Sequence, residues 1–159
     1  KVFWVAALVA ASLVAGCENP NKPQPGAPPV VVEDFGPQDV INLVNAERQK
    51  AGVSPLATNQ VLQNEAARYA AVMASKNTLS HTLEGDFGNR IRKAGYQGTN
   101  YGENIAYNYR GAPALVAGWM SSPGHRANIL NNQFKDTGVG IAHATSGQPY
   151  YCQIFGRPR

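Results

Sequence analysis

Apolar positions with a helical period dominate the chain from Gly36 onward. The first apolar face follows Pro37 and ends before Gly52, and it consists of Val40, Ile41, Leu43, Val44 and Ala46. A second face follows a cap at Thr58 or Asn59, and it consists of Val61, Leu62, Ala66, Tyr69, Ala70 and Met73. The two patterns predict two amphipathic helices.

Three shorter helices and two strands are expected after these. The helices are predicted over residues 89–94, over residues 112–120 with Trp119 facing inward, and from Pro123 behind an N-cap at Ser122. Residues 137–143 and 150–155 read as strands, joined by a turn that contains Gly147 and Pro149. Because helices come first and strands last, the pattern predicts an α+β fold.

The first 35 residues follow a different pattern. Lys1 precedes an apolar run over residues 2–14, which is typical of a secretory signal and shorter than the roughly 20 residues that span a membrane. The run ends in Leu13-Val14-Ala15-Gly16-Cys17, which resembles a bacterial lipobox whose Cys is lipidated and becomes the new N-terminus. An ordinary signal peptide with an incidental Cys17 is the less favoured alternative.

These features divide the chain into three parts. We expect a lipoprotein-type signal peptide over residues 1–16, lipidated Cys17 with a proline-rich tether over residues 17–35, and a folded domain over residues 36–159. Val30 to Val32 is either a short strand or the end of the tether. The protein is therefore expected to be exported and anchored by lipid to the cell membrane or the outer membrane, with its domain outside the cytoplasm.

Composition narrows the class of protein. Hydrophobic residues make up 43% of the 159 residues, enough to bury a core, and the net charge of +4 comes from scattered Lys and Arg, so no nucleic-acid partner is expected. If Cys17 carries lipid, Cys152 has no disulfide partner. Its aromatic and aliphatic neighbours predict a buried, inert thiol. We expect a monomer.

Few side chains offer chemistry. Of the three histidines, His125 would be the third residue of the helix capped by Ser122, where the helix dipole disfavours protonation and leaves an imidazole suited to metal binding or base chemistry. His81 lies in a polar loop, and His143 is assigned a structural role. Glu103 follows a glycine and precedes apolar residues, so it is expected to be partly buried and to need a partner such as His. Spacing alone does not bring these residues together.

Several segments, in order, resemble the CAP superfamily (SCP/TAPS), and especially its bacterial branch. They are Asn45-Ala46-Glu47-Arg48, Ser80-His81-Thr82, Gly102-Glu103-Asn104-Ile105-Ala106, Trp119-Met120-Ser121-Ser122-Pro123-Gly124-His125-Arg126-Ala127-Asn128-Ile129-Leu130, Gly138-Val139-Gly140 and Gln153-Ile154-Phe155-Gly156. They span roughly residues 38–156. The segment from Ser122 to Leu130 is the most specific of them.

The resemblance implies a three-layer α-β-α sandwich with an open cleft that holds two histidines and acidic partners. On this pattern His81 and His125 are the cleft histidines and Glu103 is a cleft acid. Two imidazoles and a carboxylate can hold Zn²⁺ with one position open for water, so these three residues are the expected metal ligands. Zn²⁺ is favoured over Mg²⁺ or Ca²⁺.

One position departs from the family pattern. Many eukaryotic members carry a second cleft Glu soon after the helix Trp, whereas Ser122 occupies that place here. Glu84 and Asp86 are possible substitutes, and the sequence does not choose between them. With one assigned carboxylate, the affinity for a divalent cation is expected to be modest.

Three functions remain, in descending order of preference. The first is a binding module for a lipid, sterol, peptide or glycan. Four tyrosines would support it if they line the cleft, and the alternative is that they pack in the core or in loops. They are Tyr96, Tyr101, Tyr107 and Tyr109. The second is a structural envelope protein whose His–Glu cluster braces the fold. The third is a hydrolase, metal-assisted or with Ser80 or Ser122 as nucleophile, although no Gly-x-Ser-x-Gly or His-Glu-x-x-His motif is present. The sequence thus favours a non-catalytic role.

Overall fold

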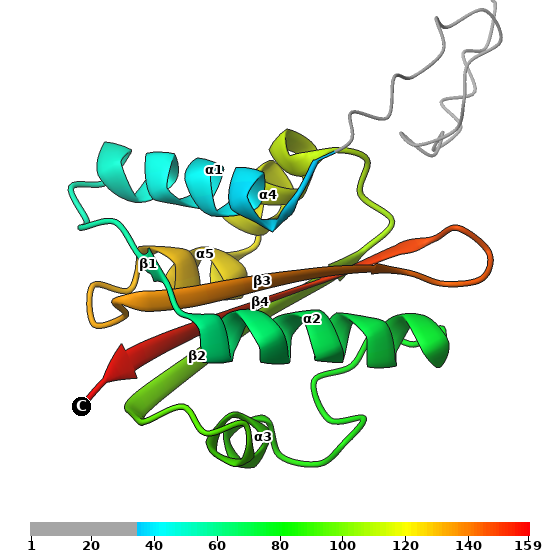
Figure 1. Ribbon diagram of the computed structural model, residues 1–159. Helices are drawn as coiled ribbons and strands as arrows, with labels where there is room; N and C mark the ends of the chain where they lie inside the picture. The colour runs from blue at the N-terminus through cyan, green and yellow to red at the C-terminus, as the bar shows by residue number, and fades with distance from the viewer. Residues whose placement is uncertain (1–34) are drawn as a thin grey trace, which may run out of the picture. The chain divides into compact units, whose positions relative to one another are not determined.

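The computed structural model describes residues 35–159, and within this range the chain forms five helices and four strands (Figure 1). The predictions for the signal peptide, Cys17 and Val30 to Val32 lie outside the described residues. In chain order the elements are α1 (Pro37–Lys50), β1 (Ala57–Thr58), α2 (Gln60–Ser75), α3 (Phe87–Lys93), β2 (Gly98–Tyr107), α4 (Ala112–Ser121), α5 (Pro123–Leu130), β3 (Asp136–His143) and β4 (Pro149–Pro158).

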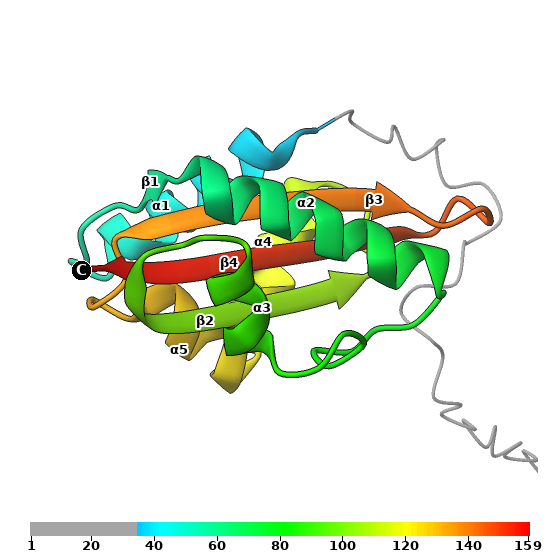
Figure 2. The ribbon, with the colours of Figure 1, turned by 60° about the horizontal axis from the view of Figure 1, so that its bottom comes forward.

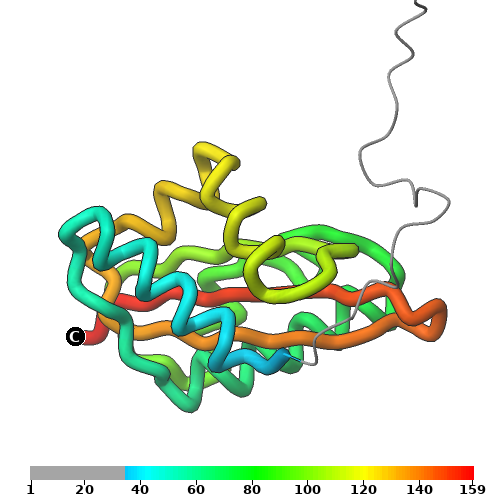
Figure 3. Tube along the Cα trace, turned by 90° about the horizontal axis from the view of Figure 1, so that it is seen from above, coloured from blue at the N-terminus to red at the C-terminus, as the bar shows by residue number. Residues whose placement is uncertain are grey.

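A four-stranded sheet forms the middle of three layers. Its strand order is β1-β3-β4-β2, with β1 parallel to β3 and the other neighbours antiparallel. Helices α2 and α3 cover one face of the sheet, and α1, α4 and α5 cover the other (Figures 1 and 2). Seen from above, α1, α4 and α5 all lie on the viewer's side of the sheet (Figure 3). The predicted α+β fold and α-β-α layering are confirmed.

Each face of the sheet has its own apolar core, because side chains alternate along a strand. In β4, Tyr151 and Phe155 point to the α1, α4 and α5 layer, where Trp119 is buried as predicted. Cys152 and Ile154 point to the α2 and α3 layer. Since both faces are covered, the central strand is buried on both sides. Phe35, the first described residue, also packs on the first core and stacks against Tyr151, with ring centroids 6.0 Å apart.

Local capping sets the helix boundaries. The Asn59 side chain accepts hydrogen bonds from the backbone N–H groups of Val61 and Leu62, at 3.0 and 3.3 Å, so Asn59 rather than Thr58 caps α2. Asp86 caps α3 by accepting from the Asn89 N–H at 2.8 Å, which makes this helix start two residues earlier than predicted. Ser122 and Pro123 start α5 as predicted, although the Ser122 hydroxyl makes no capping hydrogen bond.

Strand β2 was not among the predicted elements. Its sequence contains two glycines and several polar residues and does not alternate between apolar and polar positions. Pairing with β4 along nearly its full length makes it a strand, with Glu103 opposite Ile154. The expected order of helices first and strands last is therefore wrong, because β1 and β2 lie between helices.

Helix α2 lies directly on β3 because two glycines face it. A Cβ atom at Gly140 would lie 2.1 Å from the carbonyl oxygen of Ala66, and one at Gly138 would lie 2.2 Å from the backbone nitrogen of Gln63. The Gln63 side chain also pairs with the backbone of Val139, donating at 2.6 Å and accepting at 3.0 Å. This amide fills part of the edge of β3 that the two-residue strand β1 leaves open.

Gly140→Ala should lower the free energy of unfolding by about 3 kcal/mol, because its Cβ would meet helix backbone that cannot rotate away. Gly124→Ala is the matched control: no atom lies within 4 Å of its Cβ position in α5, and alanine should stabilise the helix by up to about 1 kcal/mol. Chemical denaturation of both variants measures the difference. Equal stabilities would contradict close packing of α2 on β3.

Candidate functional site

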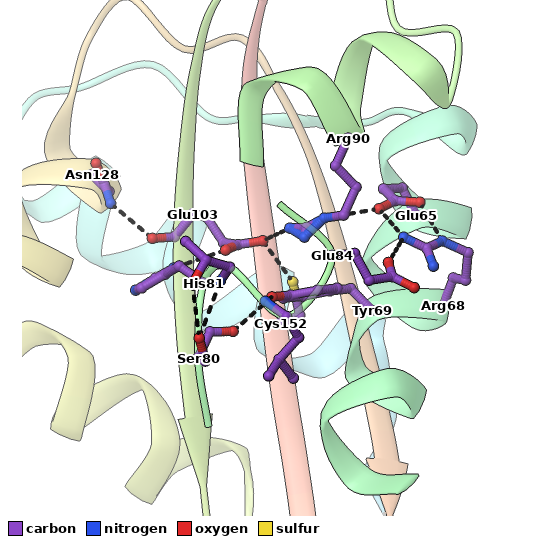
Figure 4. Close-up of polar contacts among 12 residues, drawn as sticks. Glu65, Arg68, Tyr69, Ser80, His81, Glu84, Arg90, Glu103, Asn128 and Cys152 are labelled. Carbon is purple, nitrogen blue, oxygen red and sulfur yellow. Dashed lines mark hydrogen bonds and ion pairs between the residues drawn. The ribbon is translucent and has the colours of Figure 1, made fainter. Parts of the chain in front are cut away.

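The buried carboxylate of Glu103 is the centre of the candidate site. Its side chain is 2% exposed and extends from β2, the edge strand beside α5 (Figure 4). One oxygen contacts the His81 ring, whose Nδ1 lies 2.8 Å from Oε1. The other oxygen accepts hydrogen bonds from the Arg90 guanidinium and, at 3.5 Å, from the Cys152 thiol. The predicted burial of Glu103 and its pairing with a histidine are confirmed.

The His81 ring bridges the buried carboxylate and the solvent. Its side chain is 50% exposed, while Glu103 holds its Nδ1 from behind. The loop that carries it is fixed by Tyr69 of α2, whose hydroxyl donates to the Ser80 carbonyl at 2.7 Å and accepts from the Leu83 N–H at 3.2 Å. Since Nδ1 is engaged, Nε2 is the ring atom that can face a ligand.

Opposite charges alternate in a chain behind Glu103 (Figure 4). Arg90 of α3, with its side chain 5% exposed, pairs with Glu103 and reaches Glu65 of α2 at 3.2 Å. Glu65 pairs in turn with Arg68 at 2.7 Å, and Arg68 pairs with Glu84 at 2.7 Å. The Arg90 guanidinium also lies over the Tyr69 ring, 3.3 Å from its centroid. Each buried charge therefore has an opposite charge beside it, as burial requires.

His125 lies on α5, which covers the other face of the sheet from α2 and α3. It is the third residue of α5, as predicted, and its backbone carbonyl accepts a hydrogen bond from the Asn104 side chain at 3.2 Å. Asn128 of the same helix donates to the Glu103 carbonyl at 3.2 Å and to the Asn104 side chain at 2.9 Å. Burial, together with the nearby charge of His81, lowers the pKa of His125, so its imidazole is neutral at pH 7.

Glu84 and Asp86, the two possible substitutes for a second cleft acid, have other partners. Glu84 pairs with Arg68, which lowers the Glu84 pKa, and Asp86 caps α3. The two candidate nucleophiles also lack a histidine partner within residues 35–159. The Ser80 hydroxyl lies 3.3 Å from that of Thr82, and the Ser122 hydroxyl makes no capping bond.

Sequence reasoning missed Arg90 and Glu65. A signal for Glu65 was present, because it shares the apolar face of α2 with Leu62, Ala66 and Tyr69 at helical spacing. A carboxylate on such a face must find a cation. Nothing in the seven-residue helix α3 marks Arg90 as that cation, since α3 contains further basic residues, Arg92 and Lys93.

Cys152 is fully buried, as predicted. Burial, reinforced by the negative charge of Glu103, raises the pKa of its thiol and keeps it protonated. Of the four tyrosines considered for a binding groove, Tyr107 is the exposed one, at 48%. Tyr96 is buried, and Tyr101 and Tyr109 are half-buried.

The Glu103 carboxylate, one of the three predicted metal ligands, is already engaged by protein groups. Within residues 35–159, no group of three or more His, Cys, Asp or Glu side chains is arranged to hold a metal ion. Both Glu103 oxygens are engaged by Arg90, Cys152 and His81, so this carboxylate fits the role of orienting an imidazole rather than that of a ligand.

A mostly apolar cavity lies away from His81, Glu103 and His125. Its volume is about 490 Å³, it lies between α1 and α4, and its lining consists of Leu43, Glu47, Pro113, Val116, Ala117, Met120 and Ser121. It contains no histidine.

Comparison with known proteins decides the family. Residues 41–155 match the family described as "CAP: Cysteine-rich secretory protein family". The chain belongs to the CAP family. The match includes His81, Glu103 and His125, so the resemblance seen in the sequence is confirmed.

Bacterial relatives share this CAP domain. YkwD of Bacillus subtilis (strain 168) is 36% identical over 121 residues, which cover 74% of this chain and 46% of YkwD. An extracellular protein containing an SCP domain from Bacillus anthracis is 31% identical with a TM-score of 0.67, covering 76% of this chain and 40% of that one. An outer surface protein of Borrelia burgdorferi has a TM-score of 0.71 at 22% identity, covering 77% and 94%, and shows the shared fold. The chain thus spans less than half of YkwD.

These comparisons make the chain a CAP-domain protein of bacterial type, whose bacterial neighbours are extracellular or surface proteins. None of the helices described within residues 35–159 combines the length and the apolar character needed to cross a membrane.

Replacing Glu103 by Gln should lower the free energy of unfolding by roughly 3 kcal/mol, because Arg90 then keeps its buried charge with one carboxylate fewer. Glu84→Gln, at the 36% exposed end of the same chain of ion pairs, is the matched control and should cost less than about 1 kcal/mol. Urea unfolding of both variants measures the two losses. Similar losses would mean that the buried Glu103–Arg90 ion pair contributes no more to stability than the exposed Arg68–Glu84 ion pair.

His125 should make the fold less stable in acid. Its folded pKa lies below the value of about 6.5 in the unfolded chain, so below that pH the unfolded state binds the proton first. The free energy of unfolding should therefore fall as the pH drops from about 6.5 through the folded pKa, and His125 should have no such effect at higher pH. His125→Asn should show a shallower fall than the unchanged protein between about pH 7 and pH 5. Parallel curves would contradict the lowered pKa.

Proposed function

We propose that this chain is an exported, lipid-anchored CAP-domain protein that binds a ligand at His81 and His125. In this proposal Glu103 orients His81, and Arg90 holds the Glu103 carboxylate in place. The ligand-facing groups are the Nε2 atom of His81 and the neutral ring of His125. A divalent cation, most plausibly Zn²⁺, is the simplest ligand for two imidazoles, either alone or as part of a larger ligand.

The observation that supports the proposal is that two buried charged groups hold the half-exposed His81 ring in one orientation. His81 is 50% exposed, yet a buried carboxylate and a buried guanidinium stand behind it. Buried ion pairs are weak sources of stability, and apolar side chains of the same volume often stabilise a fold more. An imidazole with one nitrogen fixed by a carboxylate and the other open is the arrangement that metal-binding histidines adopt.

The main alternative is a structural brace. Asn104 and Asn128 tie α5 to β2, and the ion-pair chain ties α3 to α2, so the same groups could serve the fold alone. A hydrolase is less favoured, because a serine nucleophile needs its base within hydrogen-bond reach. The Ser80 hydroxyl lies next to Thr82 instead.

Calorimetric titration with Zn²⁺ separates binding from bracing. The unchanged protein should give heat of binding with modest affinity, and His125→Ala should abolish it because one of the two imidazoles is lost. His143→Ala removes an exposed histidine at the end of β3 and should keep the heat. If the unchanged protein gives no heat while His125→Ala loses roughly 1–3 kcal/mol of stability, the brace is correct and the binding proposal is wrong.

The anchor is tested separately through Cys17. Cys17→Ser removes the sulfur to which lipid would be attached, so the protein should leave the membrane fraction or accumulate unprocessed. Fractionation of cells that produce either form measures the change, with Cys152→Ser as the control that leaves the lipobox intact. A Cys17→Ser protein of mature size that stays with membranes would exclude this anchor.

A further inference from the structure

A second site lies where β2 ends, about 13 Å along the strand from Glu103 at roughly 3.3 Å per residue. A cavity of about 420 Å³ opens there, and its lining consists of Asn77, Thr78, Leu79, Tyr107, Gln148 and Tyr150. These residues come from the segment after α2, from the end of β2, from the β3–β4 loop and from the start of β4. Figure 2 shows the ends of α2 and β2 and the β3–β4 hairpin together at one end of the sheet.

An exposed aromatic ring forms one wall of this cavity. Tyr107 is 48% exposed and stacks on the buried Tyr150, with ring centroids 6.0 Å apart and an interplanar angle of 22°. Tyr150 is held in turn by its hydroxyl, which donates to the Asn77 side chain at 2.9 Å. The Tyr107 ring is therefore a flat apolar surface with rigid backing. Leu79, 38% exposed, adds a small apolar contact beside it.

The polar groups around the ring are neutral amides and hydroxyls. The Asn77 carbonyl is used by Tyr150, which leaves its amide N–H groups for a ligand. Within residues 35–159, neither the Gln148 side-chain amide nor the Tyr107 hydroxyl makes a hydrogen bond to the protein. None of the described lining residues is charged. A ligand matched to this cavity is neutral, carries both donors and acceptors, and has one apolar face.

We propose that this cavity binds an oligosaccharide of N-acetylated amino sugars. The apolar C–H face of a sugar ring would stack on Tyr107, as aromatic rings with an apolar body and a polar tip allow. The acetamido group would exchange hydrogen bonds with the amides of Asn77 and Gln148 and place its methyl group on Leu79. An extended peptide fits less well, because recognition of its backbone needs a free strand edge or an apolar groove, and the lining offers side-chain amides.

This site is distinct from the His81 site, but the two are joined by the chain itself. Leu79 lines the cavity two residues before His81, and Tyr107 and Glu103 lie four residues apart on β2, on the same face of the sheet. A glycan chain could therefore run from the Tyr107 cavity toward His81 along the edge of β2. The inference does not depend on metal binding at His81 and His125.

Calorimetric titration of the full chain with the β-1,4-linked tetramer of N-acetylglucosamine tests the proposal. The tetramer should bind in the micromolar to millimolar range. Cellotetraose, in which hydroxyls replace the acetamido groups, should bind at least roughly tenfold more weakly, since tenfold corresponds to about 1.4 kcal/mol and one or two hydrogen bonds are lost. A tetramer in which alternate sugars carry an amidated, uncharged lactyl ether separates a bacterial cell-wall source from a chitin-type source, and tighter binding of either one supports the site.

Protein variants locate the binding. Tyr107→Ala should weaken binding of the tetramer at least roughly tenfold, whereas Tyr107→Phe, which keeps the ring, should retain most of it. Gln148→Ala should weaken binding several-fold. Gln49→Ala removes an exposed amide on α1 and is the matched control, which should bind as the unchanged protein does. The unchanged protein should bind the tetramer equally well with and without added Zn²⁺, so failure of the metal site and failure of this site are distinguishable.

Three results would overturn the proposal. The first is no binding of the tetramer at millimolar concentration. The second is equal binding by Tyr107→Ala or equal binding of cellotetraose. The third is saturable binding of a neutral peptide that depends on Tyr107 while the tetramer does not bind, which would assign the cavity to peptides.

Discussion

A carboxylate buried at the edge of the sheet governs the arrangement around the candidate site. Glu103 is 2% exposed, and an ion at that depth must have opposite charge and hydrogen-bond donors beside it. Arg90 supplies the opposite charge, and its ion pair with Glu103 links α3 to β2. Glu65, on the inner face of α2, pairs with the same guanidinium and links α2 to α3. His81 takes the oxygen that remains on the solvent side. The position of the exposed imidazole is thus decided by the packing of three elements behind it.

Two polar residues of the family motifs, Asn45 and Arg48, stabilise the backbone around the helices. Arg48 is buried and donates to the backbone carbonyls of Ser54, Ile129, Asn131 and Phe134, at 2.6 to 3.1 Å. It therefore ties α1 to the end of α5 and to the loop before β3. Asn45 forms a pair of hydrogen bonds with the backbone of Leu56. These two motif residues thus hydrogen-bond backbone groups in segments that lie outside or at the ends of helices and strands.

The sequence allowed the helices, the last two strands and the pairing of a histidine with Glu103 to be predicted, because each leaves a local signal. Capping residues such as Asn59 and the buried surroundings of Cys152 can be seen within a few positions. Strand β2 could not be seen in this way, since its residues become a strand by pairing with β4, which lies beyond two helices and another strand in the chain. Arg90 was missed for a related reason: its partners, Glu103 and Glu65, lie on two other elements. Contacts between residues that are distant in the sequence produce no local pattern of apolar and polar positions from which they could be predicted.

The place of β4 in the sheet has a consequence for how the molecule is made. β4 comes after every other described element in the chain, yet it lies between β3 and β2 and pairs with both. Until residue 158 has left the ribosome, β2 and β3 have no strand between them, and neither apolar core can close. The nascent domain therefore stays open until β4 has been made. The same order leaves the edges of β2 and β3 that later pair with β4 open to aggregation until β4 has been made. A chaperone that binds the nascent chain would therefore raise the yield of folded protein.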